Sequence, residues 1–80
     1  MKSIYLIKDL ASLSGYSIYT IKYYLKLGLI KEASRSIETN FRYFDNRALN
    51  DLERIHSLRL KKMSLGEIKE ILREEKGKVN

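Results

Sequence analysis

The 80-residue sequence contains no cysteine, no proline and a single histidine. Without cysteine there is no disulfide and no thiolate nucleophile, and one histidine cannot build a histidine-rich metal site. The longest uninterrupted apolar run is four residues, Ile4 to Ile7, whereas a membrane-spanning helix needs roughly 20. No signal-peptide core is visible either. We therefore expect one small cytoplasmic domain, held together by apolar side chains alone.

Features that support catalysis are also missing. There is no glycine-rich phosphate loop, because the four glycines are scattered along the chain. His56 is expected to be structural or a surface residue, since a lone histidine is rarely a ligand. Acidic residues such as Asp51 and Glu53 fit solvated helix faces. We predict a protein that is not an enzyme and has no catalytic residue, no metal, no cofactor and no small-molecule ligand.

Positive charge is in surplus. Lysine and arginine number 16 against 10 acidic residues, which gives a net charge of +6 and a pI near 9.7. Residues 1–40 carry 6 basic and 3 acidic residues, and residues 41–80 carry 10 and 7, so each half has a net charge of +3. A polyanion such as nucleic acid is one partner that this charge suits. Solubility alone accounts for similar charges in other small domains.

The first 28 residues predict two short helices joined by a turn. Apolar residues with a helical period favour a helix over residues 7–14, which Gly15 ends in a left-handed conformation. Ser17 can cap the next helix, and Gly28 can close it. On this second helix we place Ile18, Ile21 and Leu25 on the buried face. The spacing is that of a helix-turn-helix.

Residues 29–80 predict a hairpin followed by two more helices. Short strands are expected at residues 34–37 and 41–44, with Asn40 in the turn because asparagine tolerates a positive φ. Asp45 can cap a third helix that continues to Met63. Ser64 and Glu67 form a capping box ahead of a fourth helix. From residue 74 onward we expect a polar, frayed tail.

The outer face of the second helix differs from an ordinary solvated face. It carries lysines and tyrosines, and residues 10–31 include no aspartate or glutamate. Lysines can contact phosphates or guanine, and hydroxyl groups can reach phosphates or base edges. These residue types at the second position of a helix-turn-helix favour insertion into the major groove. The candidate DNA-binding residues are Ser17, Tyr19, Thr20, Lys22, Tyr23 and Lys26.

The hairpin adds Arg35, Arg42 and Tyr43 as candidate contacts. Basic residues on a two-stranded ribbon can lie along the flanking DNA backbone or in the minor groove. Arginines on a short edge hairpin also prevent edge-to-edge pairing, so the hairpin is informative only because it follows a helix-turn-helix.

Several motifs together resemble the N-terminal winged helix-turn-helix DNA-binding domain of the MerR family. The motifs, in chain order, are Ser14-Gly15-Tyr16-Ser17, Thr20-Ile21-Lys22-Tyr23-Tyr24, Gly28-Leu29-Ile30, Phe41-Arg42-Tyr43-Phe44 and Ser64-Leu65-Gly66-Glu67-Ile68. The resemblance implies a mainly α fold with four helices and a two-stranded wing. We assign residues 1–73 to this domain and residues 74–80 to the tail. Departures from the family pattern are Lys22 in place of arginine, Asn40 in place of the wing glycine and Phe44 in place of tyrosine.

The resemblance implies a double-stranded DNA-binding protein that regulates transcription. MerR-like regulators continue into a dimerisation helix and an effector-binding region. The 80 residues hold neither, so we expect no effector-binding domain and a monomer or weak dimer. Two alternatives stay open. One is an architectural factor similar to small excisionases, which bend DNA. The other is a protein-interaction module that docks on an acidic partner such as RNA polymerase.

Overall fold

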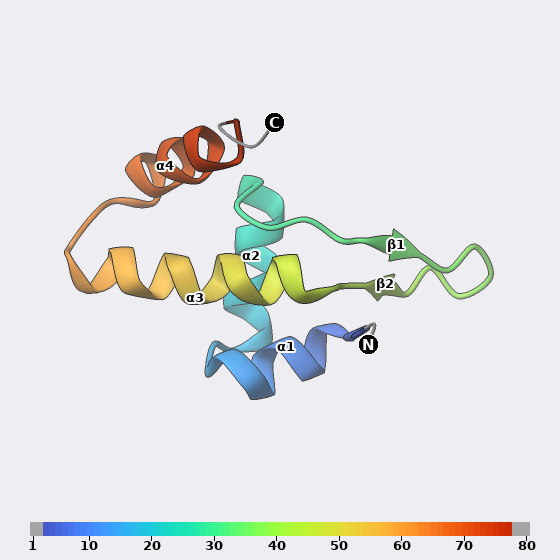
Figure 1. The fold of residues 1–80 in the computed structure, drawn as a ribbon. Coiled ribbons are helices and arrows are strands. Elements are labelled where there is room, and N and C mark those ends of the chain that lie inside the picture. Colours follow the sequence, from blue (N-terminus) through green and yellow to red (C-terminus); the bar gives the residue numbers. More distant parts are fainter. Residues whose placement is uncertain (1–2, 78–80) are drawn as a thin grey trace.

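The computed structural model describes residues 3–77, which form four helices and one two-stranded antiparallel sheet. The elements in chain order are α1 (Ile7–Ser14), α2 (Ile18–Leu27), β1 (Ser34–Arg35), β2 (Arg42–Tyr43), α3 (Asn46–Leu60) and α4 (Leu65–Gly77). In Figure 1, α2 passes behind α3 at a steep angle, and the hairpin extends away from the helices. This is the predicted mainly α fold with a hairpin wing.

The helix ends follow the local chemistry of the sequence. Gly15 and Gly28 follow α1 and α2 with φ values of 83° and 81°, a left-handed conformation that costs glycine little. Ser17 caps α2, because its Oγ accepts a hydrogen bond of 3.1 Å from the Thr20 backbone N–H. The end of α1 at Gly15 and the start of α2 at Ser17 confirm the predicted helix-turn-helix.

The later helices are capped as predicted too. Asp45 accepts a 3.0 Å hydrogen bond from the Arg47 backbone N–H at the start of α3. At the start of α4, the Glu67 side chain accepts a hydrogen bond of 2.9 Å from the Ser64 backbone N–H. The Ser64 Oγ accepts one of 3.2 Å from the Glu67 N–H in return. The two bonds complete a capping box.

One apolar core draws side chains from all four helices. The largest side chains with almost no exposure are Phe44, Leu10, Ile21, Leu29, Ile30, Leu52, Ile55 and Ile68. Phe44 also pairs with Tyr5 through two backbone hydrogen bonds of 2.7 and 2.8 Å. The base of the hairpin is thereby fixed to the segment before α1, which sets the wing relative to the helix-turn-helix.

The buried face of α2 differs from the prediction. Ile18 was expected in the core but is 37% exposed, whereas Tyr24 is only 6% exposed. Tyr24 lies three residues after the fully buried Ile21, and its ring packs edge-to-face on Tyr16 at a centroid distance of 5.5 Å. The large aromatic ring buries more apolar area than Ile18 would, so the helix turns Tyr24 inward. Leu25 is half-buried at the edge of the core.

The hairpin forms at the predicted place but with shorter strands. Pairing is limited to Ser34 with Tyr43 and Arg35 with Arg42, instead of the predicted strands 34–37 and 41–44. A turn begins at Ser36, whose carbonyl accepts a hydrogen bond of 2.9 Å from the Asn40 N–H. Asn40 has a φ of 62°, as predicted from the tolerance of asparagine for this conformation.

The prediction that the third helix continues to Met63 is wrong, because α3 ends at Leu60. The Met63 N–H donates to the Leu58 carbonyl at 3.3 Å, and the Lys62 N–H donates to the Arg59 carbonyl at 2.8 Å. These two bonds form a Schellman motif in which Lys62, with a φ of 64°, stands where glycine is usual. The bonds stop the helix even without a glycine.

α4 continues further than predicted. We expected fraying from residue 74, but the helix reaches Gly77. Two ion pairs connect this last turn to α3: Arg54 to Glu75 at 2.6 Å and Lys76 to Asp51 at 2.9 Å. Contacts between residues more than twenty positions apart are not visible in local sequence patterns. Residues 78–80 of the predicted tail lie outside the described residues.

Candidate nucleic-acid interface

The outer face of α2 is an exposed ridge of tyrosines and lysines. Tyr19 is 85% exposed and Tyr23 is 51% exposed. Lys22 and Lys26 are exposed as well. The spacing of three to four residues aligns them along one side of the helix. The structure therefore leaves this part of the predicted interface open to solvent.

Ser17 and Thr20 lie at the start of this ridge and are bonded to each other. Besides accepting from the Thr20 N–H, the Ser17 hydroxyl donates a 3.0 Å hydrogen bond to the Thr20 Oγ1. Both side chains are thus held at the first turn of α2. Their first role is to set where the helix begins.

A shallow groove of about 440 Å³ connects α2 to the hairpin. Lys22 of α2 and Arg42 of β2 both line it, together with Asn40 at the hairpin turn and Lys8 of α1. Two predicted contact residues from distant parts of the chain are thereby brought to one surface. Lys8 was missed by sequence reasoning, because it sits on the first helix and nothing in its local pattern indicates proximity to the wing.

Tyr43 and Tyr23 do not line this groove. Tyr43 is half-buried and borders a different hollow with Ile4 and Ser34, because successive side chains of a strand point to opposite faces. Tyr23 borders a hollow with Leu65 and Lys69, on the side of α2 that faces α4. On one flank of the α2 ridge, Lys22 shares the groove with Arg42 of the wing. On the other flank, Tyr23 faces α4. Tyr43 is separate from Arg42.

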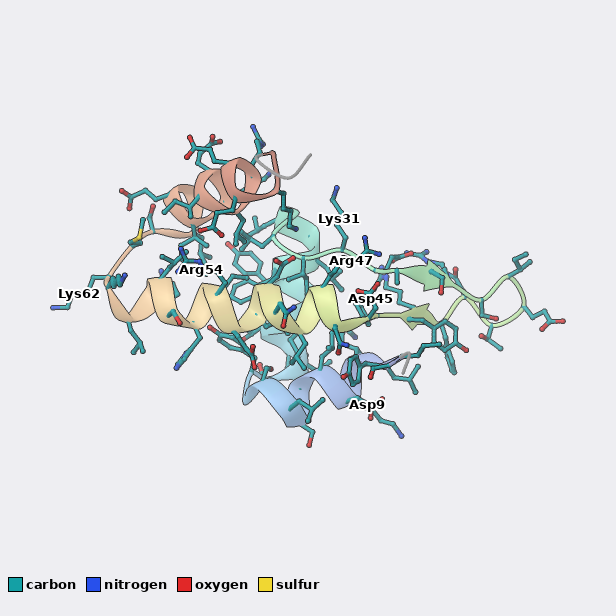
Figure 2. All side chains as sticks on the ribbon, viewed as in Figure 1. Asp9, Lys31, Asp45, Arg47, Arg54 and Lys62 are labelled. Atoms are coloured by element: carbon teal, nitrogen blue, oxygen red, sulfur yellow. The ribbon has the colours of Figure 1, made fainter. Side chains whose placement is uncertain are left out.

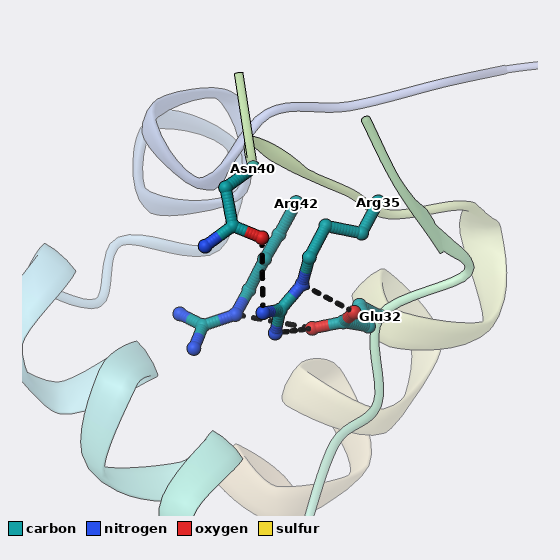
Figure 3. A network of polar contacts seen from close by, with 4 residues as sticks. All are labelled: Glu32, Arg35, Asn40 and Arg42. Carbon is teal, nitrogen blue, oxygen red and sulfur yellow. Dashed lines mark hydrogen bonds and ion pairs between the residues drawn. The ribbon is translucent and has the colours of Figure 1, made fainter. Parts of the chain in front are cut away.

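Glu32 joins the two hairpin arginines. Its carboxylate accepts from Arg35 Nε at 3.0 Å and from Arg35 Nη2 at 2.9 Å. Arg42 Nε lies 3.0 Å from the same carboxylate, and Arg35 Nη1 donates to Asn40 Oδ1 at 3.3 Å (Figure 3). Sequence reasoning missed Glu32, although its position three residues before Arg35 was a signal. A single carboxylate thus holds two side chains that were predicted to contact DNA.

These contacts change the acidity of Glu32. Hydrogen bonds from Arg35 are the main reason that the pKa of Glu32 lies below the usual 4.5 of the carboxyl group, and the charges of Arg35 and Arg42 add to the effect. We expect carboxyl NMR shifts to report a midpoint below 4.5 for Glu32. The stabilisation is complete above that pH and is lost as the pH falls through the lowered pKa. A midpoint at or above 4.5 would contradict the network.

The face around α3 has a mixed charge pattern. Figure 2 labels Arg47, Arg54 and Asp45 there. Arg47 pairs with Asp45 at 2.9 Å, and Arg54 pairs with Glu75. By contrast, α2 has no acidic residue in its sequence. The electrostatic contrast between the two faces marks α2 as the side suited to a polyanion.

Two other kinds of feature, a metal-binding cluster and a membrane-spanning helix, are absent from residues 3–77. No group of three or more histidine, cysteine, aspartate or glutamate side chains there could hold a metal ion. Among the helices of that range, none combines the length and apolar character needed to cross a membrane.

Several known proteins with a similar sequence or fold are transcription regulators. The chain is 40% identical over 68 residues to the HTH-type transcriptional regulator CueR of Bacillus subtilis (strain 168). The aligned residues cover 85% of this chain and 46% of CueR. A MerR-family regulator from Bacillus cereus superposes with a TM-score of 0.81 at 30% identity, over 88% of this chain and 52% of that one. HiNmlR, described as a MerR family regulator lacking the sensor domain, bound to promoter DNA, gives a TM-score of 0.75 at 32% identity, over 86% of this chain and 52% of HiNmlR.

The chain spans about half the length of these relatives. The family model described as MerR HTH family regulatory protein matches residues 5–75. This range includes α1, α2, both strands and α3, and all but the last two residues of α4. The resemblance found in the sequence motifs is thus confirmed. The chain belongs to the MerR HTH family of regulatory proteins.

Proposed function

We propose that this chain binds double-stranded DNA and acts as the DNA-binding part of a transcription regulator. The observation that carries the proposal is the acid-free, exposed face of α2, whose Lys22 shares a groove with Arg42 of the wing. The relative HiNmlR, which is bound to promoter DNA, supports this choice of partner. Relatives such as those from Bacillus subtilis and Bacillus cereus are bacterial, and bacterial DNA lies in the cytoplasm, so we place the site of action there.

In this proposal α2 enters the major groove. A helix with its side chains is about 10–12 Å wide, which the major groove of about 12 Å accommodates. Tyr19, Lys22 and Lys26 are the exposed residues at the centre of the ridge, and Tyr23 flanks them. Lysine is a point charge without the two-pronged geometry of arginine, so Lys22 reads guanine less selectively than an arginine would.

The wing and α1 hold the DNA backbone in the same proposal. Arg42 and Lys8 line the groove beside Lys22, so their cationic groups can reach phosphates that flank the base contacts. Phosphate contacts fix the position of a protein on the duplex without reading sequence. Ser17 and Thr20, at the first turn of α2, are close enough to the ridge to add hydroxyl contacts to the backbone.

The proposed function is tested by selecting bound sites from a pool of random DNA duplexes. We expect enrichment of a short common sequence, because α2 offers side chains that reach base edges. A symmetric pair of half-sites would indicate two copies on the DNA. If repeated rounds recover no DNA above the background of a bead-only control, the proposed function is wrong.

Arg42 gives a separate prediction. Replacing it with alanine should weaken binding to the selected site and to random duplex about equally, because a phosphate contact carries no sequence information. The slope of log K against log salt should become shallower by about one unit, as expected for one lost phosphate contact. Fluorescence anisotropy at several salt concentrations measures both quantities.

Arg47→Ala is the matched control, since Arg47 is an exposed arginine on α3 whose side chain is 83% accessible. It should leave the slope unchanged. A slope that responds equally to both variants would show that Arg42 contributes only through net charge.

A further inference from the structure

Glu32 engages Arg35 through a pair of N–H groups that could also bind a phosphate. A carboxylate and a phosphate both accept two parallel N–H bonds from a guanidinium group, and Glu32 does this with Arg35 Nε and Nη2 at 3.0 and 2.9 Å. We propose that Glu32 withholds Arg35 from DNA phosphates and thereby lowers the affinity of the chain for DNA of any sequence. This inference rests on the proposed DNA-binding function.

The two arginines are held to different degrees. Arg35 uses Nε and Nη2 on Glu32 and Nη1 on Asn40, so each of its three nitrogens is engaged. Arg42 meets Glu32 through Nε, and Figure 3 shows its two terminal nitrogens turned away from the carboxylate. Arg42 can therefore donate hydrogen bonds from its two terminal nitrogens to a phosphate while Glu32 stays in place. For Arg35, a phosphate must displace the carboxylate before it can use the paired Nε and Nη2 groups.

The carboxylate also changes the charge that the wing presents. Without Glu32 the two guanidinium groups would offer two positive charges to the DNA backbone, and with it the cluster offers one. The side chains of Arg35, Arg42 and Glu32 are 40%, 42% and 30% exposed, so solvent weakens the ion pairs. Glu32 is thus a competitor that restrains binding without preventing it.

This competition acts on phosphate contacts, which carry no sequence information. Non-specific binding is almost entirely electrostatic, so random duplex reports an additional free arginine most directly. At a matched site, the base contacts of α2 add affinity that Glu32 does not touch, so the gain from a released Arg35 should be about the same there. We therefore assign Glu32 a role in setting the overall affinity of the wing for DNA, as a residue that contacts arginines and not DNA.

The test compares Glu32→Gln with Glu38→Gln. Glu38 lies on the same hairpin, at its exposed turn, and the arginine contacts described above are made by Glu32. Both changes remove one negative charge from the wing, but only the first releases Arg35. We expect Glu32→Gln to tighten binding to random duplex about 3- to 10-fold more than Glu38→Gln at about 0.1 M salt, and to steepen the salt slope by about one unit.

Further variants and measurements separate the possible failures. Glu32→Asp keeps the charge and should bind random duplex within about twofold of the wild-type chain. Thermal unfolding of every variant checks that the fold is kept. If Glu32→Gln binds random duplex no more tightly than Glu38→Gln, the inference is wrong while the proposed function stands. If the wild-type chain binds no duplex at all, the proposed function is wrong and the inference falls with it.

Discussion

Replacing Leu52 or Ile21 with alanine is expected to lower the free energy of unfolding by about 2 to 5 kcal/mol. Both side chains are completely buried, one on α3 and one on α2, in the same apolar core. Truncation removes apolar contacts and leaves a cavity that a close-packed core fills only in part. For a domain of this size the loss is a large fraction of total stability. Chemical denaturation of each variant measures it.

Leu60→Ala is the matched control, because Leu60 ends the same helix as Leu52 but is 72% exposed. The chemical change is identical to Leu52→Ala, and the expected loss is within about 0.5 kcal/mol, as for other surface substitutions. A loss below about 1 kcal/mol for both buried residues would mean that the faces assigned to α2 and α3 are wrong.

Replacing Lys22 or Tyr23 with alanine is expected to weaken binding to the best DNA site by about 1 to 3 kcal/mol. The difference in binding free energy between this site and random duplex, the specificity margin, should become smaller. Both side chains are exposed on α2, where they can reach base edges in the major groove. Lys22 lines the groove shared with the wing, and Tyr23 lies on the flank towards α4. Titrations against the selected site and against random duplex measure the two affinities.

Two further variants identify which contacts are lost. Lys31→Ala removes the same charge from an exposed residue that lines a hollow with Arg47 of α3. It should leave the difference in affinity between the selected site and random duplex unchanged. Tyr23→Phe removes only the hydroxyl, so it separates a polar contact from ring packing. Equal losses on matched and random DNA would make Lys22 a phosphate contact. If neither alanine variant altered DNA binding, α2 would not be the recognition helix, and docking on an acidic protein would become the better interpretation.

Much of the fold could be predicted because local chemistry determines it. Gly15 and Gly28 end helices, and Ser17 begins one, through contacts within a few residues of each position. Asn40 takes the positive φ of the hairpin turn for a similarly local reason. The order of the elements and the type of each could thus be derived from spacing alone.

The errors arise where distant packing outweighs local pattern. Tyr24 replaces Ile18 in the core because Tyr16, on the preceding turn, offers its ring an edge-to-face contact. The last turn of α4 is held by ion pairs with α3, such as that between Lys76 and Asp51. Neither partner could be identified from a helical period.

The candidate site was predictable in its composition and less so in its arrangement. The acid-free stretch already indicated the exposed face of α2, including Lys22. Spacing could not reveal that Lys8 lines the same groove as Arg42, whereas the alternation of side chains along a strand already separates Tyr43 from Arg42. The control of Arg35 by Glu32 depends on how the chain turns into the strand, which residue types alone do not define.

The central claim is that α2 and the wing together form the surface that binds DNA. Adding the selected duplex to the isotope-labelled 9.4 kDa chain and following its backbone amide NMR signals tests this most directly. We expect the largest shift changes at residues 17–26, from the N-cap through most of α2, and around Arg42, with the outer face of α3 near Arg47 unchanged. Changes that are largest on the α3 face, with those of α2 unaffected, would contradict the claim.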